Sequence, residues 1–326
     1  MSTLRDAFGR QLHYLRLSIT DRCNFRCAYC LPQGCSKETS AQPLSGCEIE
    51  RLVRAFAALG FWKVRLTGGE PTTRLDVCEV VHRIAAIPGV TRIGLTTNGY
   101  RRAEIASVLR DAGLKALNVS LDSLEPERFE RITGSSRLAN IVAGVEAAVA
   151  AGIPSVKVNV VLLRGMEDGE LDRFLEWTRR LPLAVRFIEL MQTGENGEYF
   201  RQHHLPAEEI RKKLEARGWV RQEQDPGDGP ATTYRQSGYA GRAGIIAPYS
   251  AGFCDSCNRL RVSSTGKLRL CLFGDAEIPL RQLLESDHQQ AELIRTIESS
   301  MQVKPAEHLL REGRSGRTGN LASTGG

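Results

Sequence analysis

Residues 1–225 of this 326-residue chain alternate between short apolar stretches and segments with helical spacing. One stretch and the segment after it occupy roughly 25–30 residues, which is typical of βα units on a parallel sheet. We predict six strands, over Tyr14–Ile19, Val64–Thr67, Arg92–Thr97, Ala116–Leu121, Val156–Leu162 and Val185–Leu190. This alternation limits the fold to an α/β class, either a doubly wound sheet or a barrel.

Helices are predicted between the strands from their start and stop signals. Ser45 and Glu48 have the spacing of a capping box, and apolar residues follow at helical spacing until Gly60. Three more helices are predicted over Ala103–Ala112, Ile141–Ala151 and Leu171–Arg180, each followed closely by Gly or Pro.

Polar residues interrupt the predicted strands at alternate positions, as Lys63 and Arg65 do, and Lys157 and Asn159. The strands of a doubly wound sheet are buried on both faces and are continuously apolar. A barrel built around a ligand can turn such a pair of side chains inward. We therefore predict a partial (β/α)6 barrel of the TIM type.

The rest of the chain forms a C-terminal extension. A stretch rich in Asp, Gly and Pro at residues 225–230 is predicted as a linker, which divides the chain into residues 1–225 and 226–326. A helical pattern ends near Ser300. The last residues, 312–326, are mostly Gly, Ser, Thr and Arg, and on composition we expect them to lack fixed structure.

The composition excludes several classes of protein. No apolar run approaches the ~18 residues that a membrane span needs, and the N-terminus lacks the apolar core of a secretory signal. The net charge is +6, but no block of five or more Lys and Arg indicates a nucleic-acid arm. Nine cysteines are an odd number, which disfavours a disulfide framework and points to a reducing compartment, by default the cytoplasm.

Six of the nine cysteines fall into two triplets. The first, Cys23-x3-Cys27-x2-Cys30, directly follows a predicted strand. Three thiolates in so short a loop can bind three irons of a cubane cluster and leave the fourth iron open for chemistry. A structural zinc site is the alternative, but such sites favour four protein ligands.

The second triplet, Cys254-x2-Cys257-x13-Cys271, also lacks a fourth ligand nearby. Arg259 and Arg261 lie between its members and point the same way on a strand, which suits an anionic ligand. Zinc with a distant fourth ligand is again the alternative. The available candidates are His203, His204, His288, Cys35, Cys47 and Cys78, although we expect Cys47 and Cys78 to be packing residues.

The first triplet, with Tyr29 before its last cysteine, resembles the signature of the radical S-adenosylmethionine (SAM) superfamily. Gly68-Gly69-Glu70 resembles that superfamily's Gly-Gly-Glu motif. A glycine pair lets the backbone approach a ligand, and Glu70 can accept a hydrogen bond from an ammonium. With the second triplet, the strand-end stretches and the terminal Gly325-Gly326, the chain is similar over most of its length to the GTP 3′,8-cyclase family.

The resemblance implies a lyase of molybdenum cofactor biosynthesis that uses two [4Fe-4S] clusters and SAM. In that family a deoxyadenosyl radical takes hydrogen from ribose C3′ of GTP, and the C3′ radical then attacks guanine C8. Cys23, Cys27 and Cys30 match the SAM cluster ligands, and Cys254, Cys257 and Cys271 those of a cluster in the extension that binds guanine. Tyr29, Gly69, Ser120 and Met191 match SAM contacts. Arg16, Lys63, Arg65, Thr96, Lys157, Arg186, Arg259 and Arg261 match positions near GTP.

One observation from the residues alone agrees with this resemblance. The chain has no Gly-x4-Gly-Lys-Ser/Thr loop, so charged side chains on the strands must neutralise a triphosphate. The family's double-glycine end also implies that the tail enters the active site, in contrast to an ordinary frayed terminus.

The implied partners are GTP, an electron donor, and the next enzyme of the pathway, cyclic pyranopterin monophosphate synthase, by hand-off of the product. We expect no nucleic acid and no membrane, and a monomer or homodimer. Two other functions stay open at this point: a radical SAM enzyme with an auxiliary cluster that modifies peptides, and a zinc protein that binds nucleic acid.

Overall fold

The computed structural model describes residues 3–35, 42–101, 104–166, 168–223 and 229–322. Its first six strands lie side by side in chain order, each parallel to the next. They are β1 (Tyr14–Ser18), β2 (Lys63–Thr67), β3 (Arg92–Thr97), β4 (Ala116–Ser120), β5 (Ser155–Leu162) and β6 (Ala184–Glu189). All six predicted strands are confirmed, to within one residue at either end.

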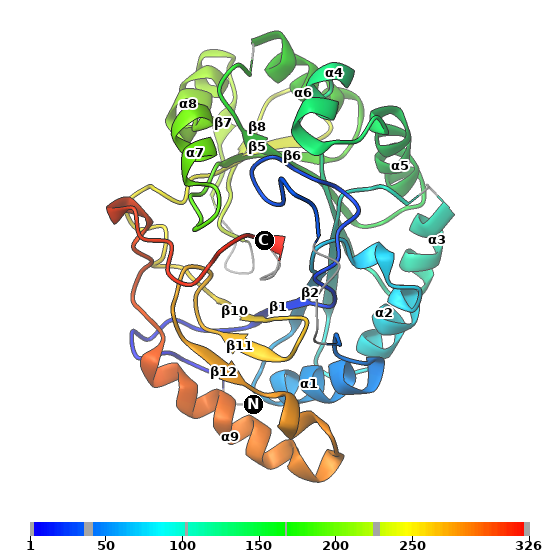
Figure 1. The fold of residues 1–326 in the computed structure, drawn as a ribbon. Helices are drawn as coiled ribbons and strands as arrows, with labels where there is room; N and C mark the ends of the chain where they lie inside the picture. Colours follow the sequence, from blue (N-terminus) through cyan, green and yellow to red (C-terminus); the bar gives the residue numbers. More distant parts are fainter. Residues whose placement is uncertain (1–2, 36–41, 102–103, 167, 224–228, 323–326) are drawn as a thin grey trace.

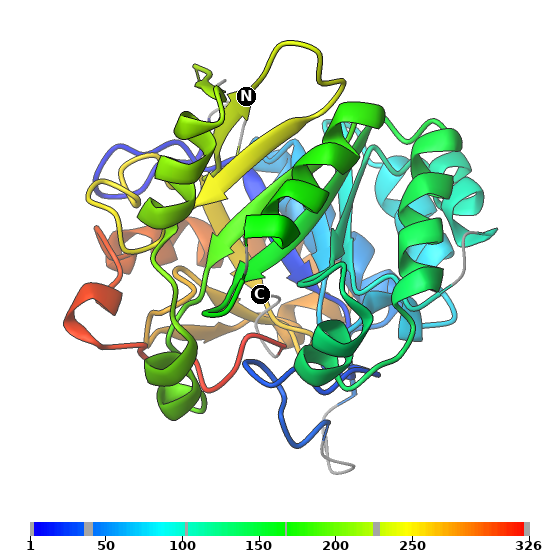
Figure 2. The same ribbon diagram turned by 90° about the horizontal axis from the view of Figure 1, so that it is seen from above.

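Helices cover the outer side of these strands, as Figures 1 and 2 show. They are α1 (Gly46–Ala58), α2 (Val77–Ala85), α3 (Glu104–Asp111), α4 (Pro126–Thr133), α5 (Leu138–Ala150) and α6 (Asp168–Arg180), with a short 3-10 turn, η1 (Pro71–Thr73). The four helices predicted between the strands are present as α1, α3, α5 and α6, although Ala103 lies outside the described residues. The helix α4 was not predicted, because it is a single short segment with only two large apolar side chains.

The rest of the chain, from residue 197 onward, adds strands to both ends of the same sheet. Its elements are α7 (Gly197–His203), α8 (Ala207–Ala216), β7 (Val220–Arg221), β8 (Thr232–Arg235), β9 (Arg242–Ile246), β10 (Arg259–Val262), β11 (Lys267–Arg269), β12 (Glu277–Pro279), η2 (Arg281–Leu284), η3 (Asp287–Gln289), α9 (Gln290–Ser300), η4 (Met301–Val303) and η5 (Leu310–Glu312). Strand β9 pairs in parallel with β6, and β10 with β1.

The described strands form one twelve-stranded sheet in the order β12-β11-β10-β1-β2-β3-β4-β5-β6-β9-β8-β7, and β12 and β7 at its two ends are not paired with each other. The predicted partial barrel is therefore confirmed. The division near residue 225 stays a prediction, because residues 225–228 of the expected linker lie outside the described part.

Alternation along the strands separates the core from the interior of the ring. In β5 the side chains of Val156, Val158 and Val160 are buried against the helices, whereas Lys157 and Asn159 face a cavity inside the ring. This is the arrangement that the polar pairs predicted, since successive strand residues point to opposite faces.

The expectation that residues 312–326 lack fixed structure is wrong for the part that the structure describes. The N–H of Gly194 donates to Thr318 O at 2.9 Å, and that of Glu195 donates to Gly319 O at 3.0 Å. Thr318 is only 1% exposed. These are mostly backbone contacts, which a sequence poor in apolar residues makes as well as any other. The segment runs to the middle of the ring (Figure 1), and Gly325 and Gly326 lie outside the described residues.

None of the helices in the described part of the chain combines the length and the hydrophobicity that a helix needs to span a bilayer.

The capping box of α1 allows the contribution of Ser45 to the stability of the fold to be tested. The Ser45 side chain accepts from the N–H of Glu48, and the Glu48 carboxylate accepts from the N–H of Ser45. We expect Ser45→Ala to lower the free energy of unfolding by about 1 kcal/mol, because an N–H at the helix start loses its partner. Urea unfolding of the apoprotein measures this. Ser45→Asp restores a cap and should recover most of the loss; an equal loss in both variants would contradict the capping role.

Candidate active site

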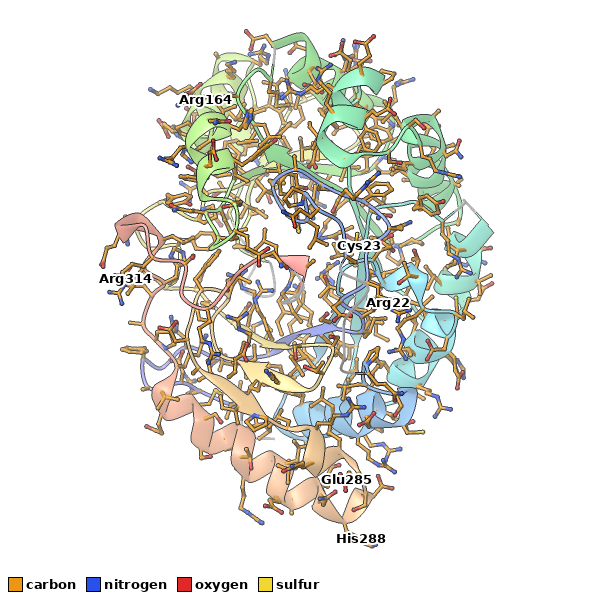
Figure 3. All side chains as sticks on the ribbon, viewed as in Figure 1. Arg22, Cys23, Arg164, Glu285, His288 and Arg314 are labelled. Carbon is orange, nitrogen blue, oxygen red and sulfur yellow. The ribbon has the colours of Figure 1, made fainter. Side chains whose placement is uncertain are left out.

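The ring of strands encloses a cavity of about 300 Å³. Its walls are the inward-facing residues of β1 to β6, β9 and β10, together with loops that follow the carboxyl ends of the strands. All eighteen residues predicted for the site line it: Arg16, Cys23, Cys27, Tyr29, Cys30, Lys63, Arg65, Gly69, Thr96, Ser120, Lys157, Arg186, Met191, Cys254, Cys257, Arg259, Arg261 and Cys271. Figure 3 shows Cys23 toward the middle of the ring.

The loop with the first triplet is fixed at several points. The N–H groups of Arg26 and Ala28 donate to Thr133 O at 3.0 Å and Ile132 O at 2.9 Å, at the end of α4. Tyr29 Oη donates to the Asp122 carboxylate at 2.8 Å, and the other oxygen of Asp122 accepts from the N–H of Val161 at 2.8 Å. Burial raises the pKa of Asp122 to about 6, although these hydrogen bonds act to lower it. The loop is thus held to β4 and β5.

The glycine pair brings the same loop against the end of β2. The N–H of Gly69 donates to Thr20 O at 2.9 Å. A Cβ atom at Gly68 would lie 2.2 Å from Thr20 O, and one at Gly69 would lie 2.3 Å from Arg22 O. The close approach that the Gly-Gly pair predicts is therefore made, at least in part, to the protein's own cluster loop.

Glu70 has a different role from the one expected of it. It is fully buried, and its carboxylate accepts from the N–H of Thr72 at 2.9 Å, from Thr97 Oγ1 at 2.7 Å and from the N–H of Asn98 at 2.6 Å. These donors join the ends of β2 and β3 through one carboxylate. Glu70 therefore fixes the loops around the cavity, and it is not among the residues that line the cavity.

The second triplet belongs to the C-terminal extension and lines the same cavity. The N–H of Cys257 donates to Cys254 O at 3.0 Å in the turn before β10, and Cys271 follows β11. Burial acts to raise the pKa of Cys257, but Arg259 and Lys304 outweigh it and lower the pKa to about 7. In the first triplet, burial raises the pKa of Cys30 to about 12.

The donor sets fit iron–sulfur clusters. In each triplet the thiols are close enough to influence one another's ionisation. The described residues contain no group of three or more Cys, His, Asp or Glu side chains placed to hold a single metal ion. A cubane cluster does not need three side chains around a single ion, because each thiolate binds its own iron. Ligation of iron also offsets the raised thiol pKa values, because metal binding displaces the protons.

The candidates for a distant fourth ligand do not reach the cavity. Neither His203, His204 nor His288 lines it. His204 Nε2 lies 2.9 Å from Glu189 Oε1, and His288 lies at the outer edge of the molecule in Figure 3.

The three remaining cysteines also lie outside the lining of the cavity. Cys78 packs on the core as predicted. Cys47 is exposed, so its prediction as a packing residue is wrong. It lies in the first turn of α1, two residues after the N-cap Ser45 and away from the buried stripe of that helix.

Positive charge dominates the cavity lining. Among the described residues, the carboxylate of Asp122 is the one acidic group in the lining, and seven Lys and Arg side chains line the cavity: Arg16, Lys63, Arg65, Lys157, Arg186, Arg259 and Arg261. Burial, with the charges of Arg186 and Arg65, lowers the pKa of Lys157 to about 6. Burial acts to raise the pKa of Tyr14, but Arg65, Arg16 and Lys63 outweigh it and lower the pKa to about 7. Both shifts mark a site that favours an anion.

Two glycines make room for cationic side chains, each on the strand next to the one that carries the arginine. Gly94 on β3 is opposite Arg65 on β2, and a Cβ atom there would lie 2.8 Å from the guanidinium carbon. Gly244 on β9 is opposite Arg186 on β6, and a Cβ atom there would lie 3.3 Å from Arg186 Cγ. The guanidinium of Arg65 is held by Tyr14 Oη, which accepts from Nε at 2.8 Å.

Several residues of the cavity were not among the predicted site residues, although the polar pair on β5 had predicted that Asn159 points inward. Asn118 and Asn159 line the cavity, and within the described part of the chain their buried amide oxygens accept no hydrogen bond. Each is two residues from a predicted site residue on the same strand, Ser120 or Lys157, and this spacing could have predicted that both side chains face the cavity. His308 lines the cavity between the rings of Phe253 and Phe273, at 5.8 and 5.7 Å. Leu321 and Ala322 also reach the cavity, where their N–H groups donate to the Cys30 thiol.

Comparisons with known proteins give two family models that together span most of the chain. The model described as "Radical SAM superfamily" matches residues 17–178, and the one described as "Molybdenum Cofactor Synthesis C" matches residues 183–310.

Solved structures with a similar fold include SuiB of Streptococcus suis bound to S-adenosylmethionine, with a TM-score of 0.61 and 13% identity over 88% of this chain and 68% of that one. The structure of anSMEcpe with bound AdoMet gives a TM-score of 0.59 and 13% identity over 93% of this chain and 94% of that one. At this identity the likeness concerns the fold.

Curated relatives are far more similar in sequence. The GTP 3′,8-cyclase of Aeromonas hydrophila is 52% identical and is aligned over 100% of this chain and 97% of its own length. Those of Yersinia pestis and Stenotrophomonas maltophilia are 50% and 49% identical over the full length of both chains. Similarity of this degree over the whole length establishes that the chain belongs to the GTP 3′,8-cyclase family of radical SAM enzymes.

Proposed function

We propose that this chain converts GTP to (8S)-3′,8-cyclo-7,8-dihydroguanosine 5′-triphosphate, the first step of molybdenum cofactor biosynthesis. The observation that carries the proposal is one cavity lined by two cysteine triplets and seven cationic side chains, in a chain about half identical to GTP 3′,8-cyclases. A nucleoside triphosphate is an anion of matching charge, and an open iron at each triplet gives the site two positions for ligands.

The first triplet, Cys23, Cys27 and Cys30, holds the cluster that works with SAM in this proposal. When bound, that cluster and SAM supply the radical chemistry that removes hydrogen from ribose C3′. The chain's own part is to fix the cluster loop, through Asp122 and the Gly68-Gly69 turn. Tyr29, Gly69, Ser120 and Met191 surround the cavity next to this triplet and are proposed to contact SAM.

The second triplet, Cys254, Cys257 and Cys271, holds the other cluster and binds the guanine end of GTP. The cationic side chains then neutralise the triphosphate. Arg65 on β2, Arg16 on β1 and Arg261 on β10 occupy paired positions, so their charges form one surface. The amide oxygens of Asn118 and Asn159 are available to accept hydrogen bonds from the ribose or the base.

The proposal extends to partners and location. An external one-electron donor reduces the first cluster, and the product passes to cyclic pyranopterin monophosphate synthase. We propose that the protein acts in the cytoplasm as a monomer or homodimer, without nucleic acid or membrane.

A reconstitution assay tests the function. We expect the anaerobically purified protein to bind about eight irons and, with GTP, SAM and reductant, to yield an isomer of GTP in mass analysis. Cys27→Ala should abolish SAM cleavage. Arg261→Ala should keep SAM cleavage but lower kcat/KM for GTP about tenfold or more, because it removes a charge-assisted contact. Normal turnover of GTP by Arg261→Ala would show that the assigned pocket is wrong.

Gly94→Ala tests the space reserved for Arg65. The added methyl group meets the flexible end of that side chain, so the fold should survive while the guanidinium moves. We expect KM for GTP to rise by about tenfold, in line with a displaced charged contact. The matched control is Gly144→Ala in α5, where a Cβ atom meets nothing within 4 Å. An unchanged KM in Gly94→Ala would mean that Arg65 does not contact GTP.

Proton uptake tests the environment of Lys157, whose pKa is lowered to about 6. Near pH 7.5 its amine is mostly neutral in the free protein, and a bound triphosphate favours the ammonium form and raises the pKa. GTP binding should therefore take up close to one proton, with affinity highest below pH 6 and falling as the pH rises above it.

Calorimetry without SAM, in buffers of different ionisation enthalpy, measures this uptake. Lys157→Met should take up about one proton fewer than the parent, and this difference removes the contribution of the GTP phosphates themselves. Equal proton uptake by the two proteins would contradict the proposed contact.

A further inference from the structure

The segment after η4 wraps the loop that carries the second cysteine triplet. Lys304 is only 3% exposed, and its Nζ lies 3.9 Å from Cys257 Sγ and donates to Leu270 O. Four residues later, the backbone of His308 lies close enough to Cys254 to favour its thiolate and to act against the rise in pKa that burial causes. One stretch, residues 304–308, thus lies against two of the three thiols of this triplet. We call it the donor segment.

The N-terminal residues hold the donor segment in place. Arg10 donates to Cys254 O at 3.1 Å and to Pro305 O at 2.6 Å, and it also donates to Ala306 O. Its Nε lies 2.6 Å from Asp6 Oδ2, in a buried ion pair. Arg10 therefore ties the cluster loop to the donor segment, which makes the position of Lys304 relative to Cys257 a built feature of the fold.

A buried lysine needs a reason to lie here. Among the residues that the structure describes, its ammonium has one oxygen partner, the carbonyl of Leu270, which does not neutralise its charge. The thiolate of Cys257 does offer negative charge, and a cluster ligated by three thiolates carries a net negative charge that grows on reduction. Hydrogen bonds to the sulfurs and nearby charge are the means by which a protein sets the potential of such a cluster.

We propose that Lys304 is a positioning residue for the second cluster. Its ammonium donates an N–H···S hydrogen bond to the Cys257 thiolate. This contact raises the reduction potential of the cluster and slows the loss of the cluster from the protein. The family resemblance does not single out this residue. The inference rests on the proposed ligation of this cluster by Cys254, Cys257 and Cys271.

The test uses full-length protein with Cys23, Cys27 and Cys30 changed to Ala, so that only the second cluster is loaded. In this background, Lys304→Met keeps most of the side-chain volume and removes the charge and the donor. Lys267→Met is the matched control, because Lys267 lies in the same extension and pairs at 3.2 Å with Glu277 at the surface. Redox titration followed by electron paramagnetic resonance gives the potential, and iron release to a chelator gives the retention.

We expect Lys304→Met to lower the equilibrium constant for one-electron reduction of the cluster by about tenfold. This change corresponds to a reduction potential that is about 59 mV more negative. Iron release should also become faster, while Lys267→Met matches the parent in both measurements. Lys304→Arg, which keeps a charged donor, should lie nearer the parent than Lys304→Met. A potential and an iron release unchanged in Lys304→Met would overturn the proposal.

Two further outcomes are also decisive. If Lys304→Met lowers the unfolding midpoint of the apoprotein by several degrees and leaves the potential of the remaining cluster unchanged, Lys304 only supports the core, and the proposal fails. If the parent with the three changed cysteines binds no cluster at all, the ligation by Cys254, Cys257 and Cys271 fails instead. Iron content of the parent thus separates failure of this inference from failure of the proposed function.

Discussion

Repulsion among buried positive charges is the constraint on which the rest of this structure depends. In the part of the chain that the structure describes, seven Lys and Arg side chains line one cavity, and its one carboxylate is that of Asp122. Burying like charges together is costly unless an anion joins them. The cost is visible in the lowered pKa of Lys157, which burial and Arg186 bring to about 6. A site with this imbalance is arranged for a highly charged ligand, as a nucleoside triphosphate is.

The backbone accommodates these charges through the parallel sheet. Strand alternation directs Arg16, Lys63 and Arg65 into the cavity. On β1, the neighbours of Arg16, which are Leu15 and Leu17, point to the opposite face and are buried in the core. Gly94, on the strand beside Arg65, leaves the space that the guanidinium occupies. The side chains are thus set by rigid strands, and the loops at the strand ends carry the thiols. Buried carboxylates join those loops, since Glu70 links the ends of β2 and β3 and Asp122 links the cluster loop to β5.

The extension completes the site because it belongs to the same sheet. Strand β10 pairs with β1 and β9 with β6, so the turn with Cys254 and Cys257 faces the cavity from the edge where the barrel is open. Residues from the two ends of the chain then fix that turn, Arg10 from one end and Lys304 from the other. The second cysteine triplet is therefore placed by contacts that span nearly the whole sequence.

Local patterns determined much of this protein. The six barrel strands, the capping box at Ser45, the two cysteine triplets and the inward polar pairs are all readable from sequence, because strand alternation, helix caps and ligand spacing are properties of neighbouring residues. Only the tertiary structure decided the rest. The tertiary structure placed Glu70 among donors from the strand-end loops, packed residues 312–322 despite their composition, and brought Lys304 beside Cys257. Each of these depends on partners far away along the chain, whose approach is set by how the strands pair and the elements pack.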